Sequence, residues 1–275
     1  MRKIILSLLC VPLFAFANTA VELDHAPINS RDKISLQRGA KNFVNYCLTC
    51  HSANYMRYSR LQDLGLNEDQ IRNNLIQTGV KVGETMSIAL KTQDAKAWFG
   101  AAPPDLTVIA RSRGADWLYS YLRGFYRDNS RPSGWNNAVF PQVGMPHVLY
   151  ELQGHRELTV IKKDNKLDPV THKPVEGQET TTHFGSDGVK TEKFEKLPEF
   201  VAHESSEHEF HTKADGKLTP VEYDQFVADL VNYLDYMGEP HKATRIQTGI
   251  IVMFFLALLF PLTVLVKKEY WKDVK

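Results

Sequence analysis

Cys47-Leu48-Thr49-Cys50-His51 stands near the start of a 275-residue chain. C-x-x-C spacing occurs in redox dithiols, in half of a zinc site and in haem attachment sites. A histidine directly after the second cysteine favours haem, because two thiols reach its two vinyl groups and the imidazole lies beneath the iron. We therefore expect Cys47 and Cys50 to bind haem c and His51 to be its proximal ligand. The alternative is a dithiol or disulfide site in which His51 lowers a thiol pKa.

The N-terminus has the pattern of a secretory signal peptide. Two basic residues precede an apolar run over residues 4–16, and Ala-Phe-Ala at 15–17 offers a small-residue cleavage site. We expect residues 1–17 to be cleaved. An N-terminal membrane anchor is the alternative, although the run is short for a bilayer core of about 30 Å. Cleavage would also remove Cys10, leaving the cysteines of the C-x-x-C-H motif as the pair in the exported protein.

The C-terminus reads as a membrane anchor. Residues 246–266 carry no charge, and at about 1.5 Å per residue such a helix matches the bilayer core. We expect a transmembrane anchor over 244–266 and a lysine-rich cytoplasmic tail over 267–275. The domain at 18–240 would then face the periplasm. The formal net charge of +1 gives no indication of nucleic-acid binding.

The rest of the chain predicts a mainly α fold. Helical patterns begin at Ser35, a plausible N-cap, extend over 105–127 with many aromatics, and resume at Val221. The segment at about 151–215 is hydrophilic and reads as an irregular insertion with short hairpins. Acidic residues outnumber basic ones between 150 and 240. This excess either steers a basic partner or simply keeps the insertion solvated.

A second axial ligand is expected in a stiff loop. Met145 stands between Gly144 and Pro146, and a thioether ligand raises the reduction potential. Met86 and His147 are the alternatives. Haem propionates need positive or hydrogen-bonding partners when buried, and the aromatic segment supplies three candidate arginines: Arg111, Arg113 and Arg123. The scattered histidines, including His208 and His211, lack the tight spacing of a zinc site.

The order of five sequence blocks resembles the cytochrome c1 family, the haem subunit of ubiquinol–cytochrome c reductase (complex III). The long insertion, and Pro-His-Val-Leu after Met145 where mitochondrial forms have a further proline pair, point to a bacterial form. The blocks are Cys-Leu-Thr-Cys-His-Ser at 47–52 with Tyr55 and Tyr58, Ala-Pro-Pro-Asp-Leu-Thr at 102–107, Ala-Arg-Ser-Arg-Gly at 110–114 with Asp116, Gly-Met-Pro at 144–146, and the anchor after Gly-Glu-Pro at 238–240.

The resemblance implies a class I cytochrome c-like domain in which the first and last helices cross, with Gly39 and Phe43 against Leu230 and Tyr233. It implies axial ligation of one covalently bound haem c by His51 and Met145. Further cofactor contacts would come from Pro103, Pro104 and Leu106, which would wrap the haem, and from Arg113 near a propionate.

The resemblance also implies a function in electron transfer. The chain would accept an electron from a Rieske iron–sulfur protein and pass it to a soluble cytochrome c, beside cytochrome b and membrane lipid in a bacterial inner membrane. It would not be catalytic alone. The main alternative is a free-standing membrane-anchored cytochrome that shuttles electrons to a terminal oxidase. A haem peroxidase with an open iron site and a membrane-tethered thiol oxidoreductase are two further rival functions.

Overall fold

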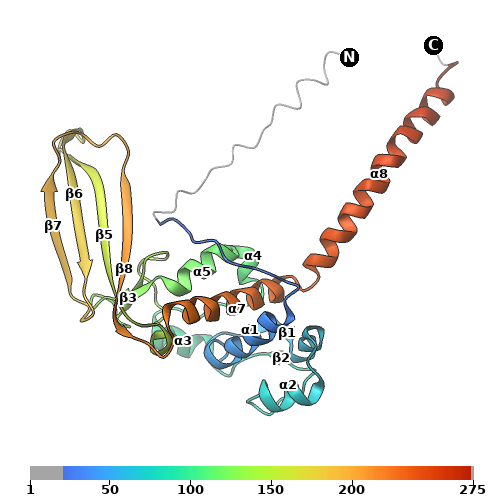
Figure 1. Ribbon diagram of the computed structural model, residues 1–275, viewed down its shortest axis with the longest axis horizontal. Helices are drawn as coiled ribbons and strands as arrows, with labels where there is room; N and C mark the ends of the chain where they lie inside the picture. The colour runs from blue at the N-terminus through green and yellow to red at the C-terminus, as the bar shows by residue number, and fades with distance from the viewer. Residues whose placement is uncertain (1–20, 274–275) are drawn as a thin grey trace.

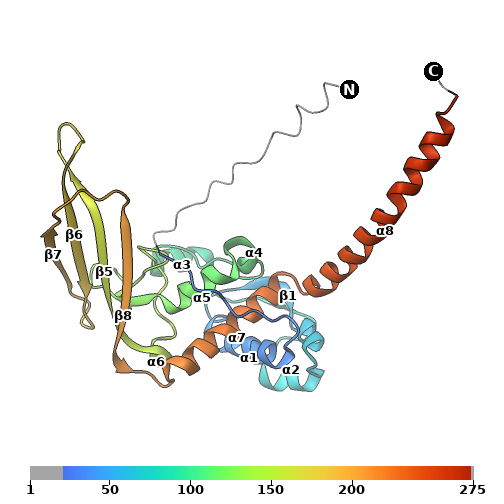
Figure 2. The ribbon, with the colours of Figure 1, turned by 45° about the horizontal axis from the view of Figure 1, so that its top comes forward.

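The computed structural model describes residues 21–273, so the expected signal peptide at 1–17 lies outside the described residues. A mainly helical body carries a sheet at one end and a long helix at the other (Figure 1). The same two projections are seen after a 45° turn (Figure 2). We call residues 21–153 and 216–241 the body, residues 154–215 the outer sheet, and α8 (Lys242–Tyr270) the anchor helix.

The body is built on the crossing of α1 (Lys33–Tyr46) and α7 (Pro220–Gly238). A Cβ at Gly39 would lie only 2.0 Å from the carbonyl oxygen of Asp229 and 2.6 Å from Cβ of Tyr233. Glycine is therefore required for the two backbones to come this close. The Phe43 and Tyr233 rings pack beside it, with centroids 5.7 Å apart. The crossing expected from the resemblance is observed.

Local capping fixes where these two helices begin. Asp32, and not Ser35 as expected, caps α1, because its carboxylate accepts hydrogen bonds from the backbone N–H groups of the first turn. Ser35 is instead a buried residue that accepts a hydrogen bond from Asn232 on α7. Thr219 caps α7 through a reciprocal capping box with Glu222.

The remaining elements of the body are short. Gly114, at φ 91°, divides the aromatic helical segment into two helices because a left-handed residue ends the first of them. In chain order the elements are β1 (Ala53–Arg57), the 3₁₀ helix η2 (Tyr58–Leu64), α2 (Glu68–Asn74), β2 (Thr85–Met86), α3 (Thr92–Phe99), α4 (Ile109–Arg113), α5 (Ala115–Arg123), β3 (Phe125–Arg127), β4 (Trp135–Asn137) and α6 (Tyr150–Gln153).

The expectation of a mainly α fold with an irregular insertion is wrong. The segment at 151–215 forms a four-stranded antiparallel sheet in the order β7-β6-β5-β8. Hairpins are present in this segment, but their strands are longer than expected. The strands are β5 (Gly154–Leu167), β6 (Pro174–Phe184), β7 (Lys190–Lys196) and β8 (Ser205–Asp215).

The strands of this sheet could not be recognised from the sequence because most of the sheet is exposed to solvent on both faces. A strand is recognised by alternating apolar residues only where one of its faces is buried. Here the small core lies at the base, where Leu158 is 1% exposed and packs with Tyr126 of the body. Further out, opposite charges pair across strands, as between Lys163 and Glu179 at 3.4 Å. Pairing between strands, and not burial of apolar side chains, therefore holds most of this sheet together.

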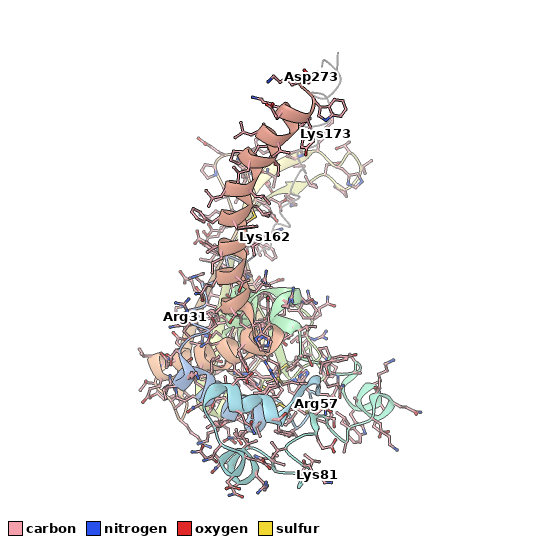
Figure 3. The ribbon with its side chains drawn as sticks, turned by 90° about the vertical axis from the view of Figure 1, so that its right-hand side faces the viewer. Arg31, Arg57, Lys81, Lys162, Lys173 and Asp273 are labelled. Atoms are coloured by element: carbon pink, nitrogen blue, oxygen red, sulfur yellow. The ribbon has the colours of Figure 1, made fainter. Side chains whose placement is uncertain are left out.

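The anchor helix projects away from the body. α8 contains a stretch long and apolar enough to cross a membrane, and none of that stretch is buried. Figure 3 shows its side chains exposed on all sides, with Asp273 at the end of the molecule opposite Arg57 and Lys81. Pro261 lies inside the helix without ending it. The described part of the chain therefore offers one candidate membrane span, as expected.

Candidate haem site

The cysteines of the C-x-x-C-H motif lie on a tight turn that follows α1. The backbone N–H groups of Cys50 and His51 both donate to the carbonyl oxygen of Cys47, at 3.1 and 2.9 Å. Cys47 and Cys50 are half-buried free thiols. The turn therefore presents two thiols and one imidazole from a single rigid segment, and Cys47 also packs against the main core.

His51 is oriented by the backbone of a distant loop. Its Nδ1 lies 2.8 Å from the carbonyl oxygen of Pro104. A carbonyl only accepts, so Nδ1 carries the proton and Nε2 keeps a free lone pair. Burial lowers the pKa of His51, against the opposing effects of the Pro104 carbonyl and Asp105. The imidazole is therefore neutral at pH 7 and suited to bind a metal through Nε2.

The loop that contains Pro104 is hydrogen-bonded to the segment after His51. Leu106 N–H donates to the carbonyl oxygen of Ser52 at 2.9 Å, and Asn54 N–H donates to the Asp105 carboxylate at 2.8 Å. Asp105 also accepts two hydrogen bonds from Thr107. These bonds join the block at 47–52 and the segment after it to the block at 102–107.

Pro103 and Leu106 differ in what surrounds them. Pro103 lines a cleft of about 220 Å³ together with Cys50. Leu106 is partly buried against the main core. Pro103 and Pro104 therefore lie beside the C-x-x-C-H segment, and Leu106 is joined to it through the bond to Ser52.

Met145 is partly buried against the same core. Its sulfur accepts a hydrogen bond from the Tyr121 hydroxyl at 3.4 Å. Burial raises the pKa of Tyr121, so this hydroxyl keeps its proton and can donate. The thioether therefore has a defined position in the loop at residues 138–149, between β4 and α6, which we call the Met145 loop.

The two alternative ligands are engaged elsewhere. Met86 is fully buried, and its sulfur is 3.7 Å from the Tyr233 hydroxyl in the helix-crossing core. His147 is 3% exposed, stacks on Phe125 and shares a 2.7 Å hydrogen bond with Gln153. Both side chains are thus explained as core residues.

The three arginines differ in their partners. Arg123 is held by Asp224 at 2.7 Å and by a second carboxylate, and Arg111 lies 4.0 Å from Glu239. Arg113 is exposed and lies over the rings of Trp117 and Phe140, at 5.1 and 5.7 Å. Within residues 21–273 it has no carboxylate in ion-pair contact. It is therefore the arginine left available for a bound anionic group.

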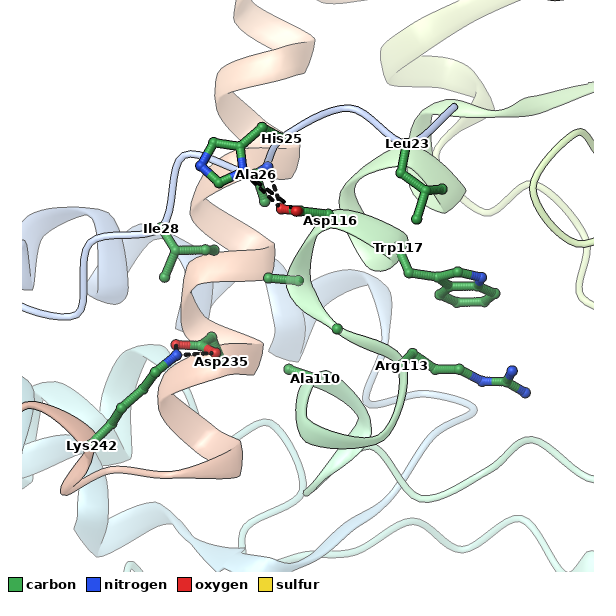
Figure 4. A pocket seen from close by; sticks show the side chains of 12 residues that line it. Leu23, His25, Ala26, Ile28, Ala110, Arg113, Asp116, Trp117, Asp235 and Lys242 are labelled. Atoms are coloured by element: carbon green, nitrogen blue, oxygen red, sulfur yellow. Dashed lines mark hydrogen bonds and ion pairs between the residues drawn. The ribbon is translucent and has the colours of Figure 1, made fainter. Parts of the chain in front are cut away.

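Arg113 also borders a second cleft. This cleft has a volume of about 590 Å³ and lies between the segment at residues 23–28, the α4–α5 junction and the start of the anchor helix (Figure 4). The Lys242–Asp235 ion pair, at 2.9 Å, and Asp116, which accepts from Ala26 N–H, lie on its wall. Figure 4 shows the Arg113 guanidinium pointing away from that ion pair, on the side of Trp117.

These residues fit a c-type haem. They provide two thiols at the required spacing, an imidazole with its Nε2 lone pair free, and a thioether at the edge of the same core. Residues 24–157 and 195–274 match the model of the Cytochrome C1 family.

The chain belongs to the cytochrome c1 family. It is 44% identical to cytochrome c1 of Allochromatium vinosum over 100% of both chains. It is 46% identical to a Nitrosomonas europaea protein named "Ammonia monooxygenase gamma subunit", covering 99% of this chain and 98% of the relative. Cytochrome c1 of Rhodospirillum rubrum is 25% identical over 89% of this chain and 83% of its own length.

Membership of the cytochrome c1 family confirms the expectation of a haem electron-transfer subunit of the bc1 complex. It implies a covalently bound haem c, and α8 fits the single membrane anchor. The family match leaves out residues 158–194, which hold most of β5, all of β6 and the start of β7. The two relatives that match over their whole length span this segment.

Several residues of the site were not singled out from the sequence. Tyr121, Asn136 and Asn137 all contact the Met145 loop or the residues that hold it. The dipeptide Asn136-Asn137 before a loop rich in Pro and Gly resembles an ordinary solvated turn. Its burial, which shows only in three dimensions, is what distinguishes it. Within the described residues, no group of three or more His, Cys, Asp or Glu side chains is placed to hold a metal ion.

Proposed function

We propose that this chain accepts one electron from a Rieske iron–sulfur protein and delivers it to a soluble cytochrome c within ubiquinol–cytochrome c reductase. The observation that carries the proposal is the His51–Pro104 contact, which frees Nε2 of His51 beside two free thiols in a member of the cytochrome c1 family. A bound haem c supplies one-electron redox chemistry at this place.

The residues of the chain bind and orient that group. Cys47 and Cys50 would attach it, and His51 and Met145 would bind its iron. The chain contains a single C-x-x-C-H, so we propose one haem. No bond of a substrate is broken here, so the chain is not catalytic alone and needs no general base.

The surrounding residues set the environment of the haem. Pro103, Pro104 and Leu106 would enclose it and limit access of water. Arg113 would hold a propionate, since a cation without a carboxylate partner suits an anionic group. An enclosed site with fixed ligands changes little between redox states, which favours rapid electron transfer.

The placement in the cell follows from the two ends of the chain. Residues 1–17 direct export and are removed, residues 18–240 lie in the periplasm, and 244–266 span a bacterial inner membrane beside cytochrome b and lipid. Residues 267–275 remain in the cytoplasm, as their lysines favour.

A second function in the same compartment is the free-standing shuttle to a terminal oxidase. The Nitrosomonas relative carries the name of a monooxygenase subunit. A shuttle would use the same thiols, imidazole and thioether. Membership of the cytochrome c1 family is what favours the bc1 function.

The test is purification of the tagged full-length chain from its native membrane. We expect cytochrome b and a Rieske protein to co-purify, with quinol-dependent reduction of soluble cytochrome c. The double variant Cys47→Ser/Cys50→Ser should lose covalent haem on a denaturing gel and lose this activity. Cys10→Ser, in the expected signal peptide, is the control and should retain both. A chain that purifies without cytochrome b and reduces a terminal oxidase would favour the shuttle.

A further inference from the structure

Two consecutive asparagines close β4 immediately before the loop that carries Met145. Asn136 is 8% exposed and Asn137 is 0% exposed. A buried amide without partners destabilises a fold, so buried amides are nearly always fully hydrogen-bonded. Among the described residues, the hydrogen-bond partners of the two amides lie on the loop, on β4 itself or on the segments that border it.

Asn137 ties the start of the loop to α5. Its Oδ1 accepts hydrogen bonds from Val139 N–H at 2.9 Å and Phe140 N–H at 3.1 Å. Its Nδ2 donates to the carbonyl oxygen of Tyr121 at 2.7 Å. Tyr121 is also the residue whose hydroxyl donates to the Met145 sulfur. One side chain therefore fixes both the loop and the tyrosine that contacts the thioether.

Asn136 holds the middle of the loop. Its Oδ1 accepts from Gln142 N–H at 2.8 Å, and its Nδ2 donates to Asp128 at 2.8 Å. Gln142 has a φ of 63°, the left-handed region that non-glycine residues avoid. Arg131 donates to the carbonyl oxygen of Gln142 at 2.9 Å. Both backbone groups of this strained residue, three positions before Met145, are thus held by side chains.

We propose that Asn137, supported by Asn136, is a positioning residue that keeps the Met145 loop closed on the haem. The inference rests on the proposed function, because it takes Met145 as the axial ligand. A thioether is a neutral ligand and stays in place only while its loop is held. Removing the buried amide leaves the N–H groups of Val139 and Phe140 without acceptors. It also takes away one of two donors to the Tyr121 carbonyl, which keeps its bond from Gly124 N–H. These losses raise the population of the open loop. An open loop lets external ligands reach the site.

The test compares Asn137→Ala with Asn232→Ala in the oxidised holoprotein. Asn232 is a matched control because it is 1% exposed and makes its hydrogen bonds to Asn29 and Ser35, away from the Met145 loop. Imidazole binding reports loop opening, since apparent affinity follows the open fraction. We expect imidazole to bind about tenfold more tightly to Asn137→Ala than to wild type, and unchanged in Asn232→Ala.

A second variant and a second readout keep the test decisive. Asn137→Asp retains the acceptor for Val139 and Phe140 but sets a buried carboxylate oxygen against the Tyr121 carbonyl, so we expect the loop to open in this variant too. Amide hydrogen exchange at Val139 and Phe140 should accelerate in both Asn137 variants and stay unchanged in Asn232→Ala. Unchanged imidazole affinity and unchanged exchange in both Asn137 variants would overturn the inference.

The failure of the ligand assignment gives a different result. If wild type lacks the weak near-infrared band of thioether–iron ligation, Met145 is not the ligand and that part of the proposed function fails. The inference about the haem fails with it. If the band is present in wild type and both imidazole affinity and amide exchange are unchanged in the Asn137 variants, only the inference is overturned.

Discussion

The carbonyl oxygen of Pro104 lies 2.8 Å from Nδ1 of His51, although 53 residues separate them. The contact joins the cysteine turn to the loop at 102–107 and determines which ring nitrogen of His51 is free. A backbone carbonyl performs this task, so side-chain replacement at position 104 leaves the acceptor in place. The residues that hold the loop, among them Asp105 and Thr107, therefore matter more than the proline ring itself for this contact.

Met145→Leu should lower the reduction potential and remove the near-infrared thioether band, because leucine has no sulfur to offer. Met86→Leu is the matched control. Its side chain is buried in the helix-crossing core, so it should cost less than about 1.5 kcal/mol of stability and leave the band intact. Redox titration and absorption spectra provide the measurement. Loss of the band in Met86→Leu with its retention in Met145→Leu would reverse the assignment.

Arg113→Gln should lower the reduction potential. A nearby positive charge favours the reduced state, which carries one more electron, and removing the charge takes this stabilisation away. Arg72→Gln is the control, since Arg72 lies on α2 and pairs with Glu68 and Asp69 at the surface. Its potential should equal that of wild type. If wild type, Arg113→Gln and Arg72→Gln have equal reduction potentials, Arg113 does not lie near the haem.

Gly39→Ala should destabilise the body by about 1–3 kcal/mol, because the new methyl group would overlap the backbone of α7. Gly83→Ala adds a methyl group with no atom within 4 Å and should be close to neutral. Urea denaturation followed by tryptophan fluorescence measures both. Equal midpoints for the two variants would mean that α1 and α7 do not cross at this residue.

Asp128 should contribute pH-dependent stability. Burial alone would raise its pKa, but hydrogen bonds from Ser130 and Asn136 outweigh burial and hold the pKa below the ordinary value. The contribution is therefore full above the unfolded pKa of about 3.9 and is lost as the pH falls through the lower folded pKa.

Asp128→Asn tests this sign. At pH 7 it should cost about 1–3 kcal/mol of unfolding free energy, and the gap to wild type should close as the pH falls below about 4. Asp69→Asn, at an exposed position on α2, loses only a surface pair with Arg72 and should cost less than about 1 kcal/mol at pH 7. A gap that widens on acidification would contradict the predicted direction.

The outer sheet should be removable without loss of the haem site. Ile161 and Glu207 face each other on β5 and β8, so Asn-Gly in place of residues 162–206 can close a two-residue hairpin. Leu158 and Phe210 at the base of the sheet are kept, whereas Phe184, which packs on Tyr126, is removed. We expect an unchanged haem spectrum and potential.

The same shortened chain tests whether the outer sheet contributes to steering. Residues 162–206 carry nine acidic and seven basic side chains, so their removal takes away a net charge of −2. If the sheet steers a basic cytochrome c, electron transfer should slow at low ionic strength and match wild type at high ionic strength. Identical rates at every salt concentration would mean that the sheet only solvates this end of the molecule.

The haem chemistry, the family and the anchor could all be predicted from the order of residues along the chain. Cys47, Cys50 and His51 are adjacent in the chain, so their geometry depends on one local turn, and an uncharged run over 246–266 needs no partner to be recognised. The outer sheet and the support of the Met145 loop depend on the folded structure. The outer sheet is held by cross-strand pairs between wet faces, which leave no apolar alternation to read. Asn137 looks like a turn residue until its burial between Tyr121 and the Met145 loop is seen, because that burial depends on how α5 packs beside the loop.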